Sequence, residues 1–129
     1  MAFTHFKGVS AYESGFAIGE KDSEVVILGP DSFETLTAAG AVSVAVSNTK
    51  LALVGAGAVT LAAPSAGMSG QIKTIEMTVD NGDVTLSLAN VQGGSAATTC
   101  TWANVGEALV LVASSAAWNV VSEGGVVLS

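Results

Sequence analysis

Two long stretches of this chain contain no charged residue, and they constrain the fold more than any other feature of the sequence. They are Leu51–Ile72 and Val84–Gly106. A membrane helix needs about 20 consecutive apolar residues. Glycine and hydroxyl residues interrupt both stretches, and the first contains Gly55, Gly57 and Pro64. We therefore predict no membrane span, but a β-domain whose surface is either coated by small neutral residues or buried against other chains.

The overall composition excludes several classes of function. Charged residues make up 12% of the 129 residues, and the net charge is -7. The chain has four lysines and no arginine, so it is a poor ligand for the phosphates of nucleic acids. One cysteine cannot form an internal disulfide, and together with one histidine it is too little for a zinc cluster. We expect no cofactor, no metal, no nucleic-acid partner and no membrane partner.

Short apolar runs separated by turn residues recur from Glu24 to the end of the chain. They predict eight to eleven strands and no convincing helix, since the one helical candidate, 32–41, is rich in threonine and glycine. The fold class we predict is all-β: an antiparallel β-sandwich or jelly-roll-like domain over residues 24–129. A solenoid is disfavoured because no exact internal repeat is visible.

Two hairpins and a core follow from the alternation of side chains. Asn48-Thr49 is expected to join the strands 42–46 and 51–54, and Asn81-Gly82 to join 72–79 and 84–88. The residues that we predict to be mostly buried are Ile75, Leu86, Leu88, Leu109, Leu111, Trp118 and Val120.

Residues 1–23 differ from the rest, and we predict that they form an extended N-terminal arm. Phe3, Phe6, Tyr12 and Phe16 are four of the seven aromatic residues of the chain, and they show no period of 2 or 3.6. Such a segment often orders on a neighbour. An ordinary first strand and loop is an equal alternative. The first eight residues lack the apolar region of a signal peptide, so we expect the protein to stay in the compartment where it is made.

Ionisable residues offer only isolated candidates for chemistry. Asp80, Asn81 and Asp83 could supply oxygen ligands to calcium, but their spacing is not that of a full calcium loop, and a hairpin turn explains the same residues without a metal. Cys100 could be a nucleophile, although its place in an alternating strand favours a small apolar filler. His5 could act as a base, but it lies in the predicted arm and has no fixed partner. The carboxylates of the first third are spread out, as on a solvated surface.

The two tryptophans could stack on sugar rings. Trp118 follows two alanines and precedes alternating valines, and Trp102 follows a threonine-rich strand. A core or inter-sheet anchor is the default interpretation of both. Exposure of either ring would favour a carbohydrate-binding function.

The second half of the chain resembles a known type of viral domain. The residues that carry the resemblance are Gly70–Ile75, Asn81–Leu86, Ala89-Asn90, Gly93-Gly94, Trp102, Val105–Leu111, Ala117–Val121 and Gly125–Val127. About residues 57–128 resemble a β-domain of tailed-bacteriophage virion structural proteins, of the type found in capsid decoration (cement) proteins and in some head or tail fibres. The motifs are structural rather than catalytic.

This resemblance implies a virion protein without catalysis, made in the host cytoplasm. We expect a homotrimer that decorates and stabilises the outer face of a phage capsid, with the major capsid protein as its partner. The capsid or subunit interface would then include Phe3, His5, Phe6, Tyr12 and Phe16. The alternative is a trimeric head or tail fibre domain that binds a host receptor or glycan.

Overall fold

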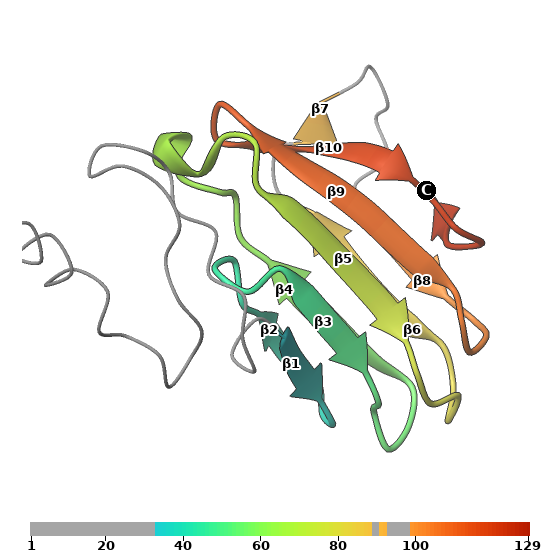
Figure 1. Ribbon diagram of the computed structural model, residues 1–129. Coiled ribbons are helices and arrows are strands. Elements are labelled where there is room, and N and C mark those ends of the chain that lie inside the picture. The colour runs from blue at the N-terminus through green and yellow to red at the C-terminus, as the bar shows by residue number, and fades with distance from the viewer. Residues whose placement is uncertain (1–32, 89–90, 93–98) are drawn as a thin grey trace, which may run out of the picture. The chain divides into compact units, whose positions relative to one another are not determined.

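The computed structural model describes residues 33–88, 91–92 and 99–129, and within them it is built almost entirely of β-strands (Figure 1). One short 3-10 helix, η3 (Ala66–Met68), lies between the fourth and fifth strands. The strands are β1 (Phe33–Leu36), β2 (Gly40–Val42), β3 (Asn48–Leu51), β4 (Gly57–Leu61), β5 (Ile72–Met77), β6 (Val84–Leu88), β7 (Val91–Gln92), β8 (Thr99–Trp102), β9 (Ala108–Ser114), β10 (Ala117–Ser122) and β11 (Val127–Leu128).

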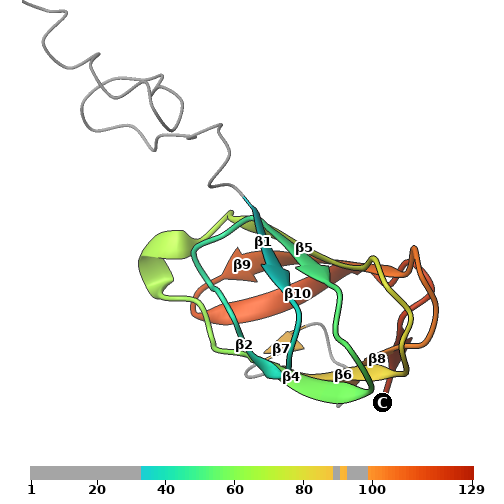
Figure 2. The ribbon, with the colours of Figure 1, turned by 90° about the horizontal axis from the view of Figure 1, so that it is seen from below.

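These strands form two sheets that pack face to face, as Figure 2 shows. The six-stranded sheet has the order β1-β3-β5-β9-β10-β7, and the five-stranded sheet has the order β11-β8-β6-β4-β2. The predicted all-β sandwich is therefore confirmed.

The sheets are mixed rather than purely antiparallel. β1, β3 and β5 run parallel to one another, and so do β2, β4 and β6 of the facing sheet. The chain crosses to the other sheet after each of these strands, so the first half is a stack of β-arches, in which consecutive strands face each other instead of pairing. Only β8, β9, β10 and β11 add antiparallel pairs.

This winding resembles a short solenoid, which the absence of a sequence repeat had disfavoured. The registers explain why no repeat is visible. Phe33 pairs with Asn48, 15 residues on, whereas Asn48 pairs with Thr74, 26 residues further. The longer turn contains the loop with η3, so the two windings differ in length and their side chains do not recur at one period.

Both predicted hairpins are wrong for the same reason. Asn48 is the first residue of β3, and the strands before and after it, β2 and β4, pair with each other in the five-stranded sheet. Asn81-Gly82 joins β5 to β6, which lie in different sheets. Arches use the same turn residues as hairpins, so Asn81-Gly82 fits either connection, whereas Asn48-Thr49 is no turn but the start of β3.

Gly82 shows what this arch requires. Its φ is +126°, a backbone conformation that side chains disfavour. A Cβ at this position would also lie 2.9 Å from the backbone nitrogen of Ala56 in the neighbouring arch. Glycine therefore allows the two arches to approach closely.

The core lies between the sheets. Leu51, Ile75, Met77, Leu86, Cys100, Trp102, Leu109, Leu111 and Trp118 have no exposed surface. Of the seven residues predicted to be buried, six are, and Val120 is half-buried against the same cluster. The alternation of apolar residues therefore identified the inward faces correctly.

Candidate functional site

The residues predicted for the capsid or subunit interface, Phe3, His5, Phe6, Tyr12 and Phe16, lie outside the described residues. Residues 24–32, where the predicted β-domain begins, lie outside them too. The N-terminal arm and its contacts stay a prediction.

Cys100 is not a reactive thiol. Its side chain is fully buried in β8, and burial, with a smaller contribution from Glu123, raises the pKa of the thiol to about 11. A nucleophilic cysteine needs the thiolate form. The thiol stays protonated at neutral pH, so the interpretation of Cys100 as a packing residue is the one that the structure supports.

The two tryptophans hold the sheets together. Both are fully buried. Trp102, on the five-stranded sheet, donates its indole N–H to the carbonyl of Ile75 on the other sheet (3.2 Å). Trp118, on the six-stranded sheet, donates in the opposite direction, to Ala62 after β4 (2.9 Å). Neither ring can stack on a sugar, and the prediction of inter-sheet anchors is confirmed.

The acidic turn between β5 and β6 is explained by its own hydrogen bonds. Asp80 Oδ1 accepts from the backbone N–H of Gly82 (3.2 Å), and Asn81 Nδ2 donates to the carbonyl of Leu53 (2.9 Å). Within residues 33–88, 91–92 and 99–129, no three His, Cys, Asp or Glu side chains are grouped so that they could hold a metal. The turn interpretation accounts for these residues.

Sequence reasoning missed a buried lysine. Lys73 lies in β5 and its side chain has no exposed surface. Its ammonium donates to the carbonyls of Ser43 (2.9 Å) and Val46 (2.7 Å), both in the arch between β2 and β3, and to Thr49 Oγ1. The carboxylate of Glu34 lies 3.6 Å from the ammonium.

Glu34 completes this cluster. Its Oε1 accepts from the backbone N–H of Ser43 (2.8 Å) and from Thr49 Oγ1 (2.7 Å). Burial lowers the pKa of Lys73 to about 8, although the nearby Glu34 carboxylate acts in the opposite direction. All three ammonium hydrogens have acceptors, so the cluster is suited to holding β1, β3, β5 and the arch together rather than to proton transfer.

The phase of the strand was the signal that could have revealed this cluster. Lys73 alternates with Thr74 and shares its face with Ile75 and Met77, both buried. A lysine on an apolar face needs a partner. No comparable signal marked Glu34, because β1 has half-buried and exposed positions only.

Charge is distributed unequally between the two sheets. The strands of the five-stranded sheet contain no charged residue, whereas β1, β3 and β5 of the other sheet contain Glu34, Lys50, Lys73 and Glu76. The two uncharged stretches of sequence supply β4, β6 and β8, the three central strands of the five-stranded sheet. The two uncharged stretches therefore account for the lack of charge in the five-stranded sheet.

The outer face of the five-stranded sheet consists of two rows of small side chains. The registers align Ala41, Thr60, Ser87 and Thr99 in one row and Ala58, Thr85, Thr101 and Val127 in the other. Every member is exposed or half-exposed. We call these eight residues the threonine-rich face. Neighbouring side chains within a row are about 4.8 Å apart across the strands, and the rows are about 6.7 Å apart.

The outer face of the six-stranded sheet differs in character. Lys50 and Glu76 are opposite each other on β3 and β5, and the Lys50 ammonium lies 5.2 Å from the ring centroid of Phe33 on the edge strand. Ile72, paired with Val112, is 58% exposed. This face combines charged and aliphatic side chains.

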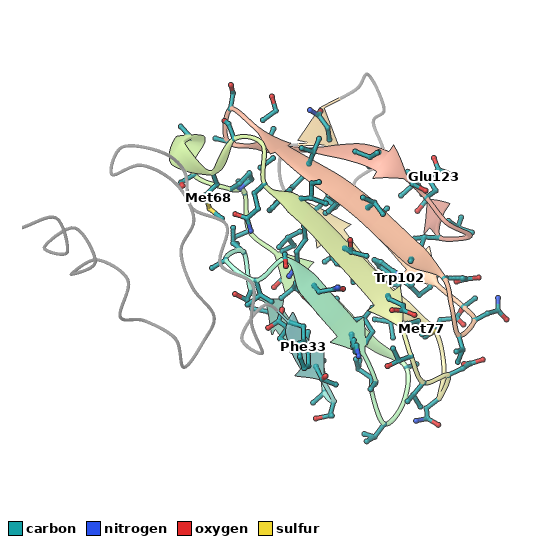
Figure 3. All side chains as sticks on the ribbon, in the orientation of Figure 1. Phe33, Met68, Met77, Trp102 and Glu123 are labelled. Atoms are coloured by element: carbon teal, nitrogen blue, oxygen red, sulfur yellow. The ribbon has the colours of Figure 1, made fainter. Side chains whose placement is uncertain are left out.

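The other four charged residues of the described part of the chain lie in the turns at one end of the sandwich. Asp80 and Asp83 lie between β5 and β6, Glu107 precedes β9, and Glu123 follows β10. Hydrogen bonds join these turns: Gly106 N–H donates to Met77, and Ala108 N–H donates to Gly124. Figure 3 shows Glu123 far from Met68 of η3, at the opposite end. None of the described charged residues therefore belongs to the threonine-rich face.

The comparisons with known proteins add no identification. No family model matches the chain, and no curated protein is significantly similar to it. A search of the described residues for an apolar helix of membrane-spanning length finds none.

Proposed function

We propose that the chain is a non-catalytic structural domain that docks, through its uncharged surface, into a larger assembly. The finer form of this proposal is that the assembly is a tailed-phage virion and that the domain decorates the outer face of the capsid. The threonine-rich face is the observation that carries the proposal.

A sheet face without charge is unusual on a protein that carries a net charge of -7. Interface centres are depleted of charged residues, because each buried charge must be desolvated. The face also spans all five strands of its sheet, so it offers a broad and rigid contact area. The acidic turns at the end of the sandwich suit a solvent-facing surface and would repel packaged DNA.

The described residues offer little that favours catalysis. Cys100 holds its proton, Lys73 is fully hydrogen-bonded and inaccessible, and the described acidic residues are divided between two strands and three turns. An active site needs ionisable groups that converge in a pocket. The second candidate, a fibre domain that binds glycans, loses the support that an exposed tryptophan would have given it.

Immunogold electron microscopy of purified tailed-phage particles that encode the chain tests the virion role. We expect gold label on the outer surface of the head in intact particles. Label on the tail alone would favour the fibre alternative. Absence of the chain from purified particles, checked by mass spectrometry, would refute a virion role.

A further inference from the structure

We infer that the partner of the threonine-rich face is a second copy of this chain, so that the five-stranded sheets of neighbouring copies face one another around a symmetry axis. This inference rests on the proposed docking function and names the occupant of the same surface. Three observations carry it: the side-chain chemistry of the face, the distribution of charge and the shape of the two edges.

The chemistry of the face is complementary to itself. A hydroxyl group both donates and accepts hydrogen bonds, so threonine and serine can pair with identical residues. A surface of one charge sign cannot do this, because it would oppose like charges. Thr60, Ser87 and Thr99 are neighbours in one row, so their hydroxyls offer donors and acceptors side by side. Identical copies that meet around an axis need this property.

The charge of the chain restricts where two copies can meet. Each copy carries a net charge of -7, so close approach is opposed over most surfaces. On the threonine-rich face no strand residue is charged, and four of the six described carboxylates belong to turns beyond the strand ends. A contact between these faces keeps the acidic ends of both copies in solvent.

The edge strands of the five-stranded sheet are short, so its outer face offers a larger contact area than its edges do. Its edge strands, β2 and β11, have three and two residues. Short edges discourage strand-to-strand pairing between copies. Association through the flat face therefore needs no extension of the sheet.

Two matched substitutions test the location of the contact. Ser87 and Asn48 are both exposed strand residues: Ser87 lies in β6 on the threonine-rich face, and Asn48 begins β3 on the outer side of the other sheet. Ser87→Glu and Asn48→Glu each change the net charge from -7 to -8. By sedimentation velocity on the full chain, we expect Ser87→Glu to weaken association at least about 100-fold, because like charges would oppose each other. Asn48→Glu should leave it within about threefold of the wild type, and thermal melts should show both variants folded.

Cross-linking gives an independent readout that does not depend on destabilising the contact. Cys100 is buried, so an added surface cysteine is the reactive one. A short bis-maleimide should join copies of Ser87→Cys and should leave Asn48→Cys unlinked. Cross-linking of Asn48→Cys alone would overturn the inference and assign the contact to the six-stranded sheet.

The outcomes separate this inference from the proposed function. A wild-type chain that is monomeric at high micromolar concentration refutes self-association, whereas labelled phage heads would still support docking to another protein. Oligomers that depend on Ser87, together with particles that lack the chain, refute the virion role and keep the self-association.

Discussion

The two sheets of this sandwich are stabilised by different means. The five-stranded sheet has only apolar residues on its inner side and uncharged residues on its outer side. The six-stranded sheet contains a buried ammonium, a partly buried carboxylate and a hairpin with an unusual turn. The same core is therefore bounded by apolar packing alone on the five-stranded sheet and by packing together with a polar cluster on the six-stranded sheet. The polar side fixes the arches, and the apolar side leaves its outer face available for contact.

The largest expected effect tests whether the two inner faces are equivalent. Leu86 and Leu111 face each other's sheet and have no exposed surface. Replacing either with alanine should lower the free energy of unfolding by roughly 2–5 kcal/mol, since each leaves a cavity. Urea denaturation measures both. A loss at one position and none at the other would mean that one sheet is loosely packed.

Removal of the buried lysine should lower the free energy of unfolding by breaking the polar cluster of the six-stranded sheet. Lys73→Met leaves the Glu34 carboxylate and the carbonyls of Ser43 and Val46 without their donor. We expect a loss of about 3 kcal/mol in the free energy of unfolding, measured in urea. The double variant Glu34→Gln with Lys73→Met should lose less than the single variant, because no unpaired charge remains. Equal or larger loss in the double variant would contradict the cost assigned to the unpaired Glu34 carboxylate.

One residue on each sheet, Lys73 and Cys100, should change the stability of the protein in opposite directions at alkaline pH. The pKa of Lys73 is lowered to about 8 in the folded protein from 10.5. Between these values the unfolded chain binds more protons, so this group increases stability as the pH rises. The pKa of Cys100 is raised to about 11 from 9.0, so the folded protein binds more protons and stability falls as the pH rises from 9 to 11.

Single variants separate these two effects. We expect the stability of Cys100→Ala, relative to the wild type, to increase between pH 9 and 11. The relative stability of Lys73→Met should decrease between pH 8 and 10.5, because the variant lacks the gain. Each change should amount to a few kcal/mol at most, read from urea melts at a series of pH values. Parallel pH profiles of both variants and the wild type would contradict the assigned pKa directions.

The sequence predicted strands better than it predicted their pairing. Alternation in Ile72–Met77 and Val84–Leu88 reflects which side chains face the core, and that requirement is the same in a hairpin and in an arch. Pairing depends on where the chain goes after the turn. Asn81-Gly82 satisfies the geometry of both connections, so local sequence could not distinguish them.

The sequence predicted that the candidate docking surface would be uncharged, but not which strands would form it. The lack of charge in Leu51–Ile72 and Val84–Gly106 indicated neutral surface, but these stretches become neighbours only through the parallel pairing of β4 with β6. The phase of β5 marks Lys73 as a buried residue, but its partners were beyond sequence reasoning for a similar reason. Its partners are 24 to 39 residues away in the chain and come from arches of unequal length.

The smallest expected effect concerns the turn between β9 and β10, which belongs to the six-stranded sheet. Ser115 and Ala116 connect the paired residues Ser114 and Ala117, and both have positive φ, 49° and 65°. Two-residue hairpins of this geometry favour Asn-Gly, because other side chains strain the backbone. Ser115→Asn with Ala116→Gly should therefore raise the free energy of unfolding by about 1 kcal/mol in urea.

A matched glycine substitution controls for the added flexibility of the unfolded chain. Ala45 is exposed in the arch between β2 and β3, and within the described part of the chain only Ser115 and Ala116 combine a side chain with positive φ. Ala45→Gly should leave stability unchanged or lower it slightly, since glycine relieves no strain there. If both glycine variants change stability equally, the turn is not strained. A gain confined to the Asn-Gly variant would mean that the six-stranded sheet has kept Ser-Ala at this turn in spite of its conformational cost.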